Sequence, residues 1–281
     1  MNVKYSILSA LALTCSHNVL AQQASPWLPE PGALSVNISQ VEQSADQLYV
    51  GGQRQDLPSD LDQSTTALNV VYGLSDRFSL DATVGYADSD FNASEQDLSG
   101  ITDSNIGITY QLVNEFAHEN AWVPSVSARA GVIIDGDYRV GTVDAIGDGG
   151  NGAEISVAVG KQLNPYIAVS TYAGYRDRSN DVPAELLYGA SLYATPFERW
   201  NSFVSYNVAD SLSGLDIGGP GFAPDRFPEV EEDRRYIQLG LQYAITDQFS
   251  AGVSAATIVD GRNTADSDIY GLTLSYNTWL F

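Results

Sequence analysis

Apolar residues alternate with small or polar residues, with a period of two, along most of the chain. In residues 78–87 every second residue from Phe78 to Tyr86 is apolar, and the residues between them are small or polar. This alternation predicts β-strands with one apolar face. We recognise twelve such segments, near 34–43, 63–72, 78–87, 103–112, 122–134, 152–163, 166–176, 185–194, 200–209, 234–245, 249–257 and 269–281.

Two architectures contain strands of this kind. A soluble β-sandwich turns the apolar faces into a core, whereas a membrane-spanning barrel turns them outward to lipid. The connections favour the barrel, because short turns alternate with long segments, as periplasmic turns alternate with extracellular loops in outer-membrane barrels. The short turns include 73–77, 164–165 and 246–248, and the long segments include 44–62, 88–102, 135–151, 210–233 and 258–268.

Aromatic residues flank the short turns. The flanking pairs are Tyr72 and Phe78, Tyr110 and Trp122, Tyr193 and Trp200, and Tyr243 and Phe249. Aromatic side chains favour the boundary between hydrocarbon and water, so these pairs predict a girdle at one membrane interface. A second belt is predicted from tyrosines near the other strand ends, namely Tyr86, Tyr175, Tyr206, Tyr236 and Tyr270.

These patterns predict an all-β fold, a single 12-stranded antiparallel up-and-down transmembrane β-barrel of the outer-membrane type. Residues 1–21 have the basic, apolar and small-residue regions of a signal peptide, which predicts export to the outer membrane of a Gram-negative bacterium. We assign 22–33 to a short periplasmic leader and 34–281 to the barrel. Because so short a leader cannot form a hatch domain, we expect any gate to come from the long loops, with 210–233 as the strongest candidate.

The end of the last strand leaves two interpretations open. A terminal aromatic residue, Phe281, resembles the signal that outer-membrane proteins present to their insertion machinery. Strict alternation, however, places Leu272 and Leu274 toward lipid and Trp279 on the opposite face. Either a bulge lies near 277–278, or the outward assignment of this strand is wrong.

The charge of the chain limits its partners. Asp and Glu number 35 against 13 Lys and Arg, which gives a formal net charge of −22 and argues against nucleic acid as a partner. Most of the acidic residues fall in the long connections. We expect outer-membrane lipid and lipopolysaccharide around the barrel, with divalent cations at the acidic loops.

Few residues are available for catalysis after removal of the signal peptide. His118 is then the one histidine, Lys161 is the one lysine, and no cysteine remains, which excludes disulfides and thiolate chemistry. Both His118 and Lys161 fall at the predicted periplasmic end, so an active site near the outer rim would lack a general base. Acidic pairs such as Asp88 and Asp90 arise readily in loops this acidic. We therefore expect neither enzymatic activity nor a cofactor.

A calcium site is conceivable in the segment 135–151. Asp135 and Asp137, with Asp144 and Asp148 on the same segment, provide the oxygen ligands that Ca²⁺ prefers. Their spacing does not match the twelve-residue calcium loop. We therefore prefer an acidic surface that attracts divalent ions diffusely.

The inward-facing positions of the strands are small and polar, with few charges. The clearest charges are Asp81, Arg129 and Glu154, and Arg129 and Glu154 fall on neighbouring strands. They could form a constriction of the lumen, or an ion pair that only holds the strand register. Basic residues are too few at these positions for the arginine or lysine rings that a channel for acidic sugars would need.

Three segments resemble a known family. Trp27 within SPWLPEPG (25–32), the turn YGLSDRFSL that begins at Tyr72, and GLTLSY that begins at Gly271 resemble the outer-membrane β-barrel transporters named for the MetA pathway of phenol degradation. The resemblance covers most of the mature chain and implies passage of small, aromatic or weakly polar compounds. It implies no functional residues, because the matching positions belong to turns and strands.

The sequence therefore favours a passive channel for small molecules. The main alternative is a non-conducting outer-membrane barrel whose acidic surface loops serve as receptor or adhesin. A soluble periplasmic β-sandwich is the third possibility.

Overall fold

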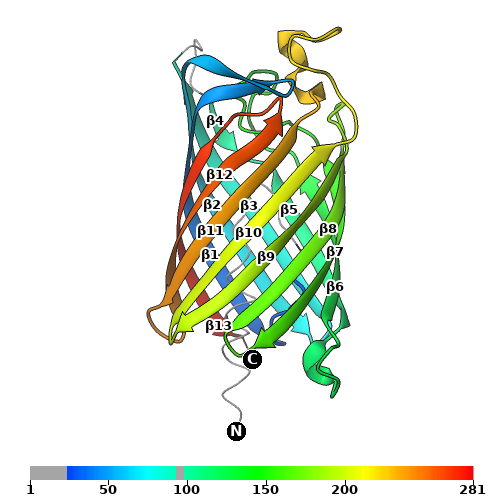
Figure 1. Cartoon of the computed structure of the whole chain (residues 1–281), viewed down its shortest axis with the longest axis vertical. Helices are drawn as coiled ribbons and strands as arrows, with labels where there is room; N and C mark the ends of the chain where they lie inside the picture. Colours follow the sequence, from blue (N-terminus) through cyan, green and yellow to red (C-terminus); the bar gives the residue numbers. More distant parts are fainter. Residues whose placement is uncertain (1–23, 93–97, 281) are drawn as a thin grey trace.

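The computed structural model describes residues 24–92 and 98–280, which form a closed barrel of tilted strands (Figure 1). The strands are β1 (Ala33–Val50), β2 (Gln53–Ser75), β3 (Phe78–Phe91), β4 (Leu98–Ile101), β5 (Ser104–Val113), β6 (Ser125–Ile134), β7 (Gly152–Asn164), β8 (Ile167–Arg178), β9 (Glu185–Phe197), β10 (Trp200–Ser211), β11 (Asp233–Ala244), β12 (Phe249–Arg262) and β13 (Asp268–Trp279). Both β4 and β5 pair with β3, at successive positions along it. They share one place in the wall, so the barrel is 12-stranded.

The wall closes between the first and last strands. β1 pairs with β13 from Ala33↔Trp279 to Ser44↔Asp268, and on its other side it pairs with β2. All strand pairings are antiparallel, and every other neighbour in the wall is a neighbour in sequence. Closure gives each spanning strand a partner on both sides, as a bilayer requires, and only the short β4 pairs on one side. The predicted fold class is confirmed.

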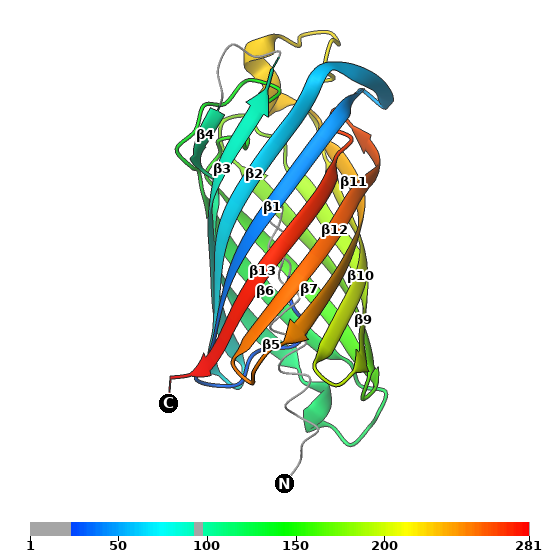
Figure 2. The same ribbon diagram turned by 90° about the vertical axis from the view of Figure 1, so that its left-hand side faces the viewer.

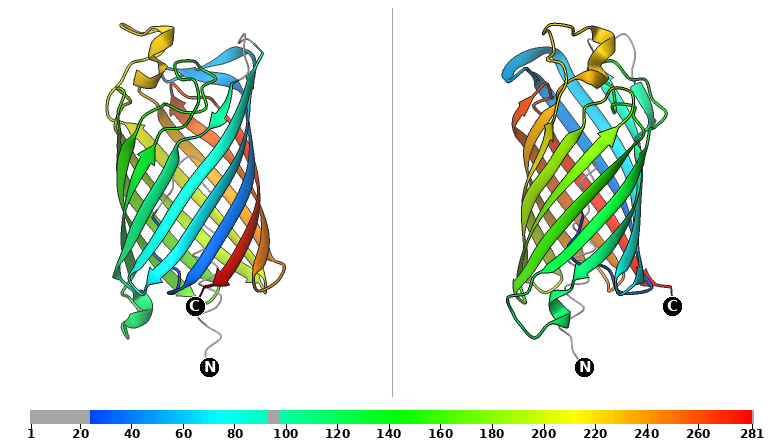
Figure 3. Two further views of the ribbon diagram at one scale, coloured as in Figure 1. Left: turned by 180° about the vertical axis from the view of Figure 1, so that it is seen from behind. Right: turned by 90° about the vertical axis from the view of Figure 1, so that its right-hand side faces the viewer.

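The two ends of the barrel differ, as the connection lengths predict. One end, the short-turn end, carries the turns after β2, β5, β7, β9 and β11 together with the C-terminus of β13 (Figure 3). The other, the long-loop end, carries the β1–β2 hairpin and the segment with the 3-10 helix η2 (Pro224–Glu229) (Figure 2). A shorter 3-10 helix, η1 (Glu115–Ala117), follows β5. Among the described residues, no helix has the length and hydropathy needed to span a membrane.

Burial in this barrel is the reverse of burial in a soluble protein. On β7 the side chains of Ile155 and Val157 are exposed, whereas those of Glu154 and Ser156, which alternate with them, are buried. The largest fully buried side chains in the described chain are polar, and they include Glu154, Glu185 and Asn207. The apolar faces therefore point outward and the polar faces line the lumen, which is the arrangement of a barrel in lipid and excludes the β-sandwich.

Three predicted long connections are shorter than expected, because strand pairing continues beyond the apolar segments. β1 and β2 remain paired up to Val50↔Gln53, so most of 44–62 is hairpin and not loop. β3 continues to Phe91 and β12 to Arg262. Backbone hydrogen bonds stabilise a hairpin in water as well as in lipid, so the apolar alternation marks only the part of each strand that faces hydrocarbon. In the segment 210–233 the 3-10 helix η2 forms.

The last strand keeps its register. The pairing of β13 with β1 is unbroken, which excludes the bulge, and Leu272 and Leu274 are exposed on the outer face as first assigned. Trp279 lies opposite Ala33 at the short-turn end and is 55% exposed. Its position has the inward parity of the strand, but its side chain is exposed because the wall ends there. Phe281 and the predicted signal peptide lie outside the described residues.

Two aromatic assignments were wrong. Ring contacts at the short-turn end do form an outer girdle, with Phe78 and Tyr110 4.9 Å apart and Trp200 and Tyr243 4.8 Å apart between ring centroids. Tyr193, in contrast, is buried and its ring contacts Trp27 of the leader. Tyr236 is likewise buried, against Tyr49 and Ile258.

Candidate functional site

The lumen charges expected from the sequence form one buried network. Arg129 on β6 contacts Asp81 on β3 through two hydrogen bonds, Nε to Oδ1 at 3.0 Å and Nη2 to Oδ2 at 2.6 Å. Its Nη1 contacts Oε1 of Glu154 on β7 at 3.2 Å, and Nη2 also donates to Asn105. The Arg129 side chain is 1% exposed. Such a bidentate pair fixes the guanidinium in orientation as well as in position.

A glycine on the intervening strand makes this network possible. β5 lies between β3 and β6, so the Arg129 side chain must cross β5 to reach Asp81. It crosses at Gly107, where a Cβ would lie 2.2 Å from Nη2 of Arg129. Any larger residue at this position would displace the guanidinium from Asp81.

The network continues along the inner wall toward the long-loop end. Arg176 on β8 donates to Glu154 Oε2 at 2.9 Å and to Glu185 Oε2 on β9 at 3.2 Å. Arg178 also donates to Glu185, at 3.0 Å, and to Asp148 of the β6–β7 loop at 2.6 Å. Positive and negative side chains thus alternate along the wall, and each member of this network has an oppositely charged partner.

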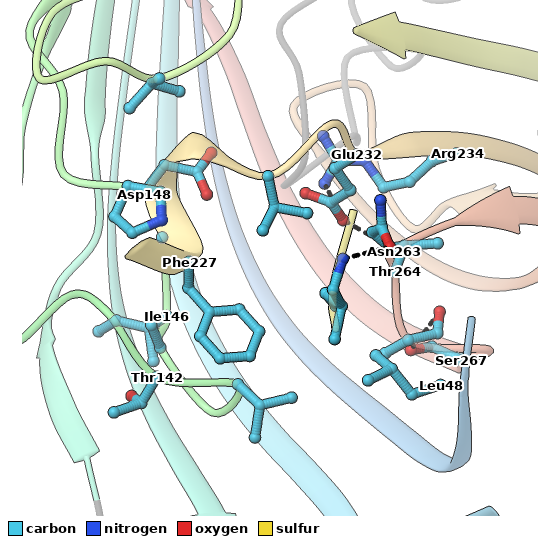
Figure 4. Close-up of a pocket in the computed structure, with 18 of the residues that line it drawn as sticks. Leu48, Thr142, Ile146, Asp148, Phe227, Glu232, Arg234, Asn263, Thr264 and Ser267 are labelled. Carbon is cyan, nitrogen blue, oxygen red and sulfur yellow. Dashed lines mark hydrogen bonds and ion pairs between the residues drawn. The ribbon is translucent and has the colours of Figure 1, made fainter. Parts of the chain in front are cut away.

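The charged wall ends at a cavity of about 220 Å³ (Figure 4). Arg178, Glu185 and Arg234 line it from the barrel wall, and Asp148 and Glu232 line it from the loops. Its remaining lining is mixed, with apolar residues such as Ile146, Phe227 and Leu48 beside polar ones such as Asn263 and Thr264. Burial raises the pKa of Glu232, and the Arg234 guanidinium beside it opposes this shift. The sequence had indicated none of these residues as a site except Asp148, which was considered only for calcium.

The short leader enters the lumen from the opposite end. Ala24 packs against Ala158 of β7, Tyr172 of β8 and Leu187 of β9. Trp27 packs against Ala168 and Tyr193, and its ring is nearly perpendicular to that of Tyr193 with centroids 5.9 Å apart. These wall residues all lie on inward-facing positions. Residues 24–32 therefore occupy the short-turn end of the barrel, a position that the sequence analysis did not predict for the leader.

Hydrogen bonds hold the leader in place. Ser127 donates to the carbonyl of Ser25 at 2.6 Å, and Gln111 donates to that of Pro26 at 3.0 Å. The indole of Trp27 donates to Glu115, which Lys161 also binds at 2.7 Å. The wall is shaped to receive the leader. A Cβ on Gly160 would lie 2.4 Å from the ring of Pro26, so only glycine fits there.

The sequence could identify Arg129 and Glu154 from strand parity alone, but it missed the extension of the network. Arg176 and Arg178 do fall on the inward parity of β8, and this was the signal available for them. Glu185 and Arg234 lie at strand ends, where parity is hard to distinguish from loop. The described lumen also contains more arginine than the sequence analysis expected, namely Arg129, Arg176, Arg178 and Arg234.

The catalytic and metal candidates do not assemble into further sites. His118 is exposed in the connection after η1, and Lys161 is held by Glu115. Asp137 bridges by backbone to Ile101 instead of joining a carboxylate cluster. In the part of the chain that the structure describes, no group of three or more His, Cys, Asp or Glu residues is arranged to hold a metal. Asp135 and Asp137 are therefore not part of such a group.

No family model and no curated protein matches the chain. Among solved structures it is similar to the COG4313 outer membrane channel from Pseudomonas putida F1, with 16% identity and a TM-score of 0.67, covering 93% of this chain and 99% of that one. It is also similar to the KdgM porin in complex with disordered oligogalacturonate, with 9% identity and a TM-score of 0.54, covering 86% and 98%. The NanC porin gives 9% and 0.53, covering the same shares. At these identities the likeness establishes the outer-membrane barrel fold.

Proposed function

We propose that this chain is a passive outer-membrane channel for small molecules. The observation that carries the proposal is the charged lumen, in which Arg129, Arg176 and Arg178 alternate with acidic partners along the inner wall. A barrel with only a structural role would fill its interior with bulky packed side chains, whereas here small polar residues and ion pairs line it. The solved channels and porins of similar fold agree with this function.

Different parts of the chain restrict the two ends of the proposed path. A solute enters at the long-loop end, which faces the outside of the cell, through the cavity beside Arg234, and follows the charged wall past Arg176 and Arg129. The leader then stands between it and the periplasm. Passage therefore requires the leader to move from its position around Trp27.

The remaining sequence expectations belong to the same proposal. A cleaved signal peptide exports the chain, the insertion machinery assembles it in the outer membrane of a Gram-negative bacterium, and lipopolysaccharide surrounds the outer leaflet. Divalent cations gather at the acidic loops. The solutes are small and aromatic or weakly polar, as the resemblance to the phenol-degradation family implies, and the chain catalyses no reaction.

One observation favours the alternative, a non-conducting barrel whose acidic loops act as receptor or adhesin. The leader occupies the short-turn end of the lumen, as a permanent plug would. The two functions differ in conductance. Purified protein in a planar lipid bilayer should give single-channel currents, and deletion of residues 24–31 should increase them. If protein shown to be folded by heat-modifiable gel migration stays silent with and without the leader, the channel function is wrong.

A further inference from the structure

The cavity at the long-loop end contains one charged group with few partners. Among the described residues, Arg234 makes a single hydrogen bond, from Nη2 to Glu185 Oε1 at 3.4 Å. Its contact with Glu232 Oε1 is 3.8 Å long, which exceeds hydrogen-bond distance. A guanidinium carries five N–H donors, so those of Arg234 that face the cavity have no acceptor among the described residues, although Glu185 and Glu232 compensate its charge. The side chain is 18% exposed and lines the cavity.

The carboxylates around this cavity are better satisfied. Glu185 accepts hydrogen bonds from Arg176, Arg178 and Arg234. Asp148 is bound by Arg178 at 2.6 Å, and Glu232 accepts a 2.6 Å bond from the hydroxyl of Thr264 (Figure 4). The unmet demand of the cluster is therefore for an acceptor beside Arg234. A ligand that meets this demand carries an anionic oxygen.

The apolar side chains of the cavity indicate that the remaining part of such a ligand, its body, is apolar. Ile146 of the β6–β7 loop, Phe227 of η2 and Leu48 of β1 present apolar side chains to it. A closed apolar cavity of roughly 150 Å³ accepts a benzene molecule, so the volume here, about 220 Å³, has room for one ring and a small polar group. Larger acids such as oligosaccharides do not fit within it.

We propose that this cavity is a binding site for a small monocarboxylate with an apolar, ring-sized body, whose carboxylate is held by Arg234 and whose body packs against Phe227 and Ile146. The inference rests on the proposed channel function, since it names the class of solute that the channel selects.

Isothermal titration calorimetry on the full chain folded in detergent tests the site, with benzoate as the probe. Benzoate should bind, and phenol and acetate should each bind at least about tenfold more weakly, because each lacks one half of the recognised structure. Arg234→Gln should weaken benzoate binding about tenfold or more. Arg235→Gln is the matched control, because the neighbouring arginine pairs with Asp210 and Asp260 and does not line the cavity.

A second variant keeps the test decisive if Arg234→Gln does not fold. Phe227→Ala lies in η2, outside the barrel wall, and should weaken benzoate binding while leaving that of acetate unchanged. The proposal is wrong if benzoate binds equally to the wild type and to the folded Arg234→Gln or Phe227→Ala variant. It is also wrong if benzylamine binds more tightly than benzoate, because the acidic residues would then be the determinants.

The experiments can contradict the proposed binding site and the proposed channel function independently of each other. Currents in a bilayer without benzoate binding in detergent would leave a channel that lacks this selectivity. Benzoate binding by a protein that never conducts would leave a receptor site in a closed barrel.

Discussion

The indole Nε1 of Trp27 donates a hydrogen bond to Oε1 of Glu115 over 2.9 Å, although 88 positions separate the two residues. Glu115 is 6% exposed, and it also binds the ammonium of Lys161 and accepts from the backbone N–H of Gln162. The contact joins the leader to the turn that contains η1. The buried carboxylate of Glu115 therefore helps to hold the leader in the lumen.

We predict that Trp27→Ala loosens the leader and increases single-channel conductance. The substitution removes the indole from its packing against Tyr193 and leaves Glu115 without one of its donors. The lost apolar burial and the lost hydrogen bond together are worth about 1–3 kcal/mol. This free energy shifts the population toward the undocked leader about fivefold to 150-fold.

Trp122→Ala is the matched control for this change. Trp122 lies in the same connection as η1, is 90% exposed and has no role in docking the leader. Equal conductance of the Trp27 variant and the wild type, with the Trp122 variant also unchanged, would show that the leader does not restrict flow.

We predict that Arg129→Gln both destabilises the barrel and increases its preference for cations. Asp81 and Glu154 would lose a buried guanidinium, and breaking a buried ion pair costs about 3–5 kcal/mol. Their remaining negative charge would face the lumen. Urea unfolding measures the first effect and the reversal potential in a salt gradient the second. Arg77→Gln, at an exposed arginine in the β2–β3 turn, should change neither. If the ion selectivity is unchanged in Arg129→Gln, Arg129 has only a structural role.

We predict that Val157→Arg lowers the free energy of unfolding by about 2–4 kcal/mol, because its side chain points to lipid in the middle of β7. Ile167→Arg, at the start of β8 on the same outer face, should cost about 0–1 kcal/mol, since an arginine there reaches the interface. Unfolding in lipid vesicles measures both. If both variants lose the same free energy of unfolding, Val157 is not deeper in the bilayer than Ile167, and the proposed position of the wall in the membrane is wrong.

We predict that the Asp103 carboxyl, between β4 and β5, titrates above its ordinary range. Burial raises its pKa, and hydrogen bonds from the Tyr138 hydroxyl and the Gly136 N–H oppose part of that shift. The folded state therefore holds this proton more tightly than the unfolded state does. The stability it contributes is present below the ordinary value of 3.8 and is lost as pH rises through the raised pKa.

Carboxyl NMR of Asp103 measures this titration. Tyr138→Phe removes a hydrogen bond to the ionised carboxylate, so the pKa should rise further. Tyr188→Phe is the control, because that hydroxyl binds Asp210. A lower pKa in the Tyr138 variant would mean that the hydroxyl does not stabilise the ionised form.

The alternation along the chain was enough to predict the barrel, the apolar part of each strand and, except at Tyr193 and Tyr236, the face on which the residues lie. Alternation has a period of two and the two faces meet different solvents, so Phe78 and Ser79 could be assigned to lipid and lumen from their parity. The same rule brought Arg129 and Glu154 onto neighbouring strands. It marked the hydrocarbon-facing part of β1 and β2 but not their extension into the hairpin, where no apolar face is needed.

The residues that fill the lumen could not be predicted from the alternation, because they are set by contacts between strands and between the leader and the wall. The curvature of the wall brings together inward side chains of strands that are separated by one neighbour, so Asp81 meets Arg129 across Gly107, and Arg234 meets Glu185, through contacts that no local pattern encodes. The leader has no periodicity at all. Its place follows from Trp27 fitting a particular cavity beside Glu115 and Tyr193, and complementarity of this kind exists only after the barrel has closed.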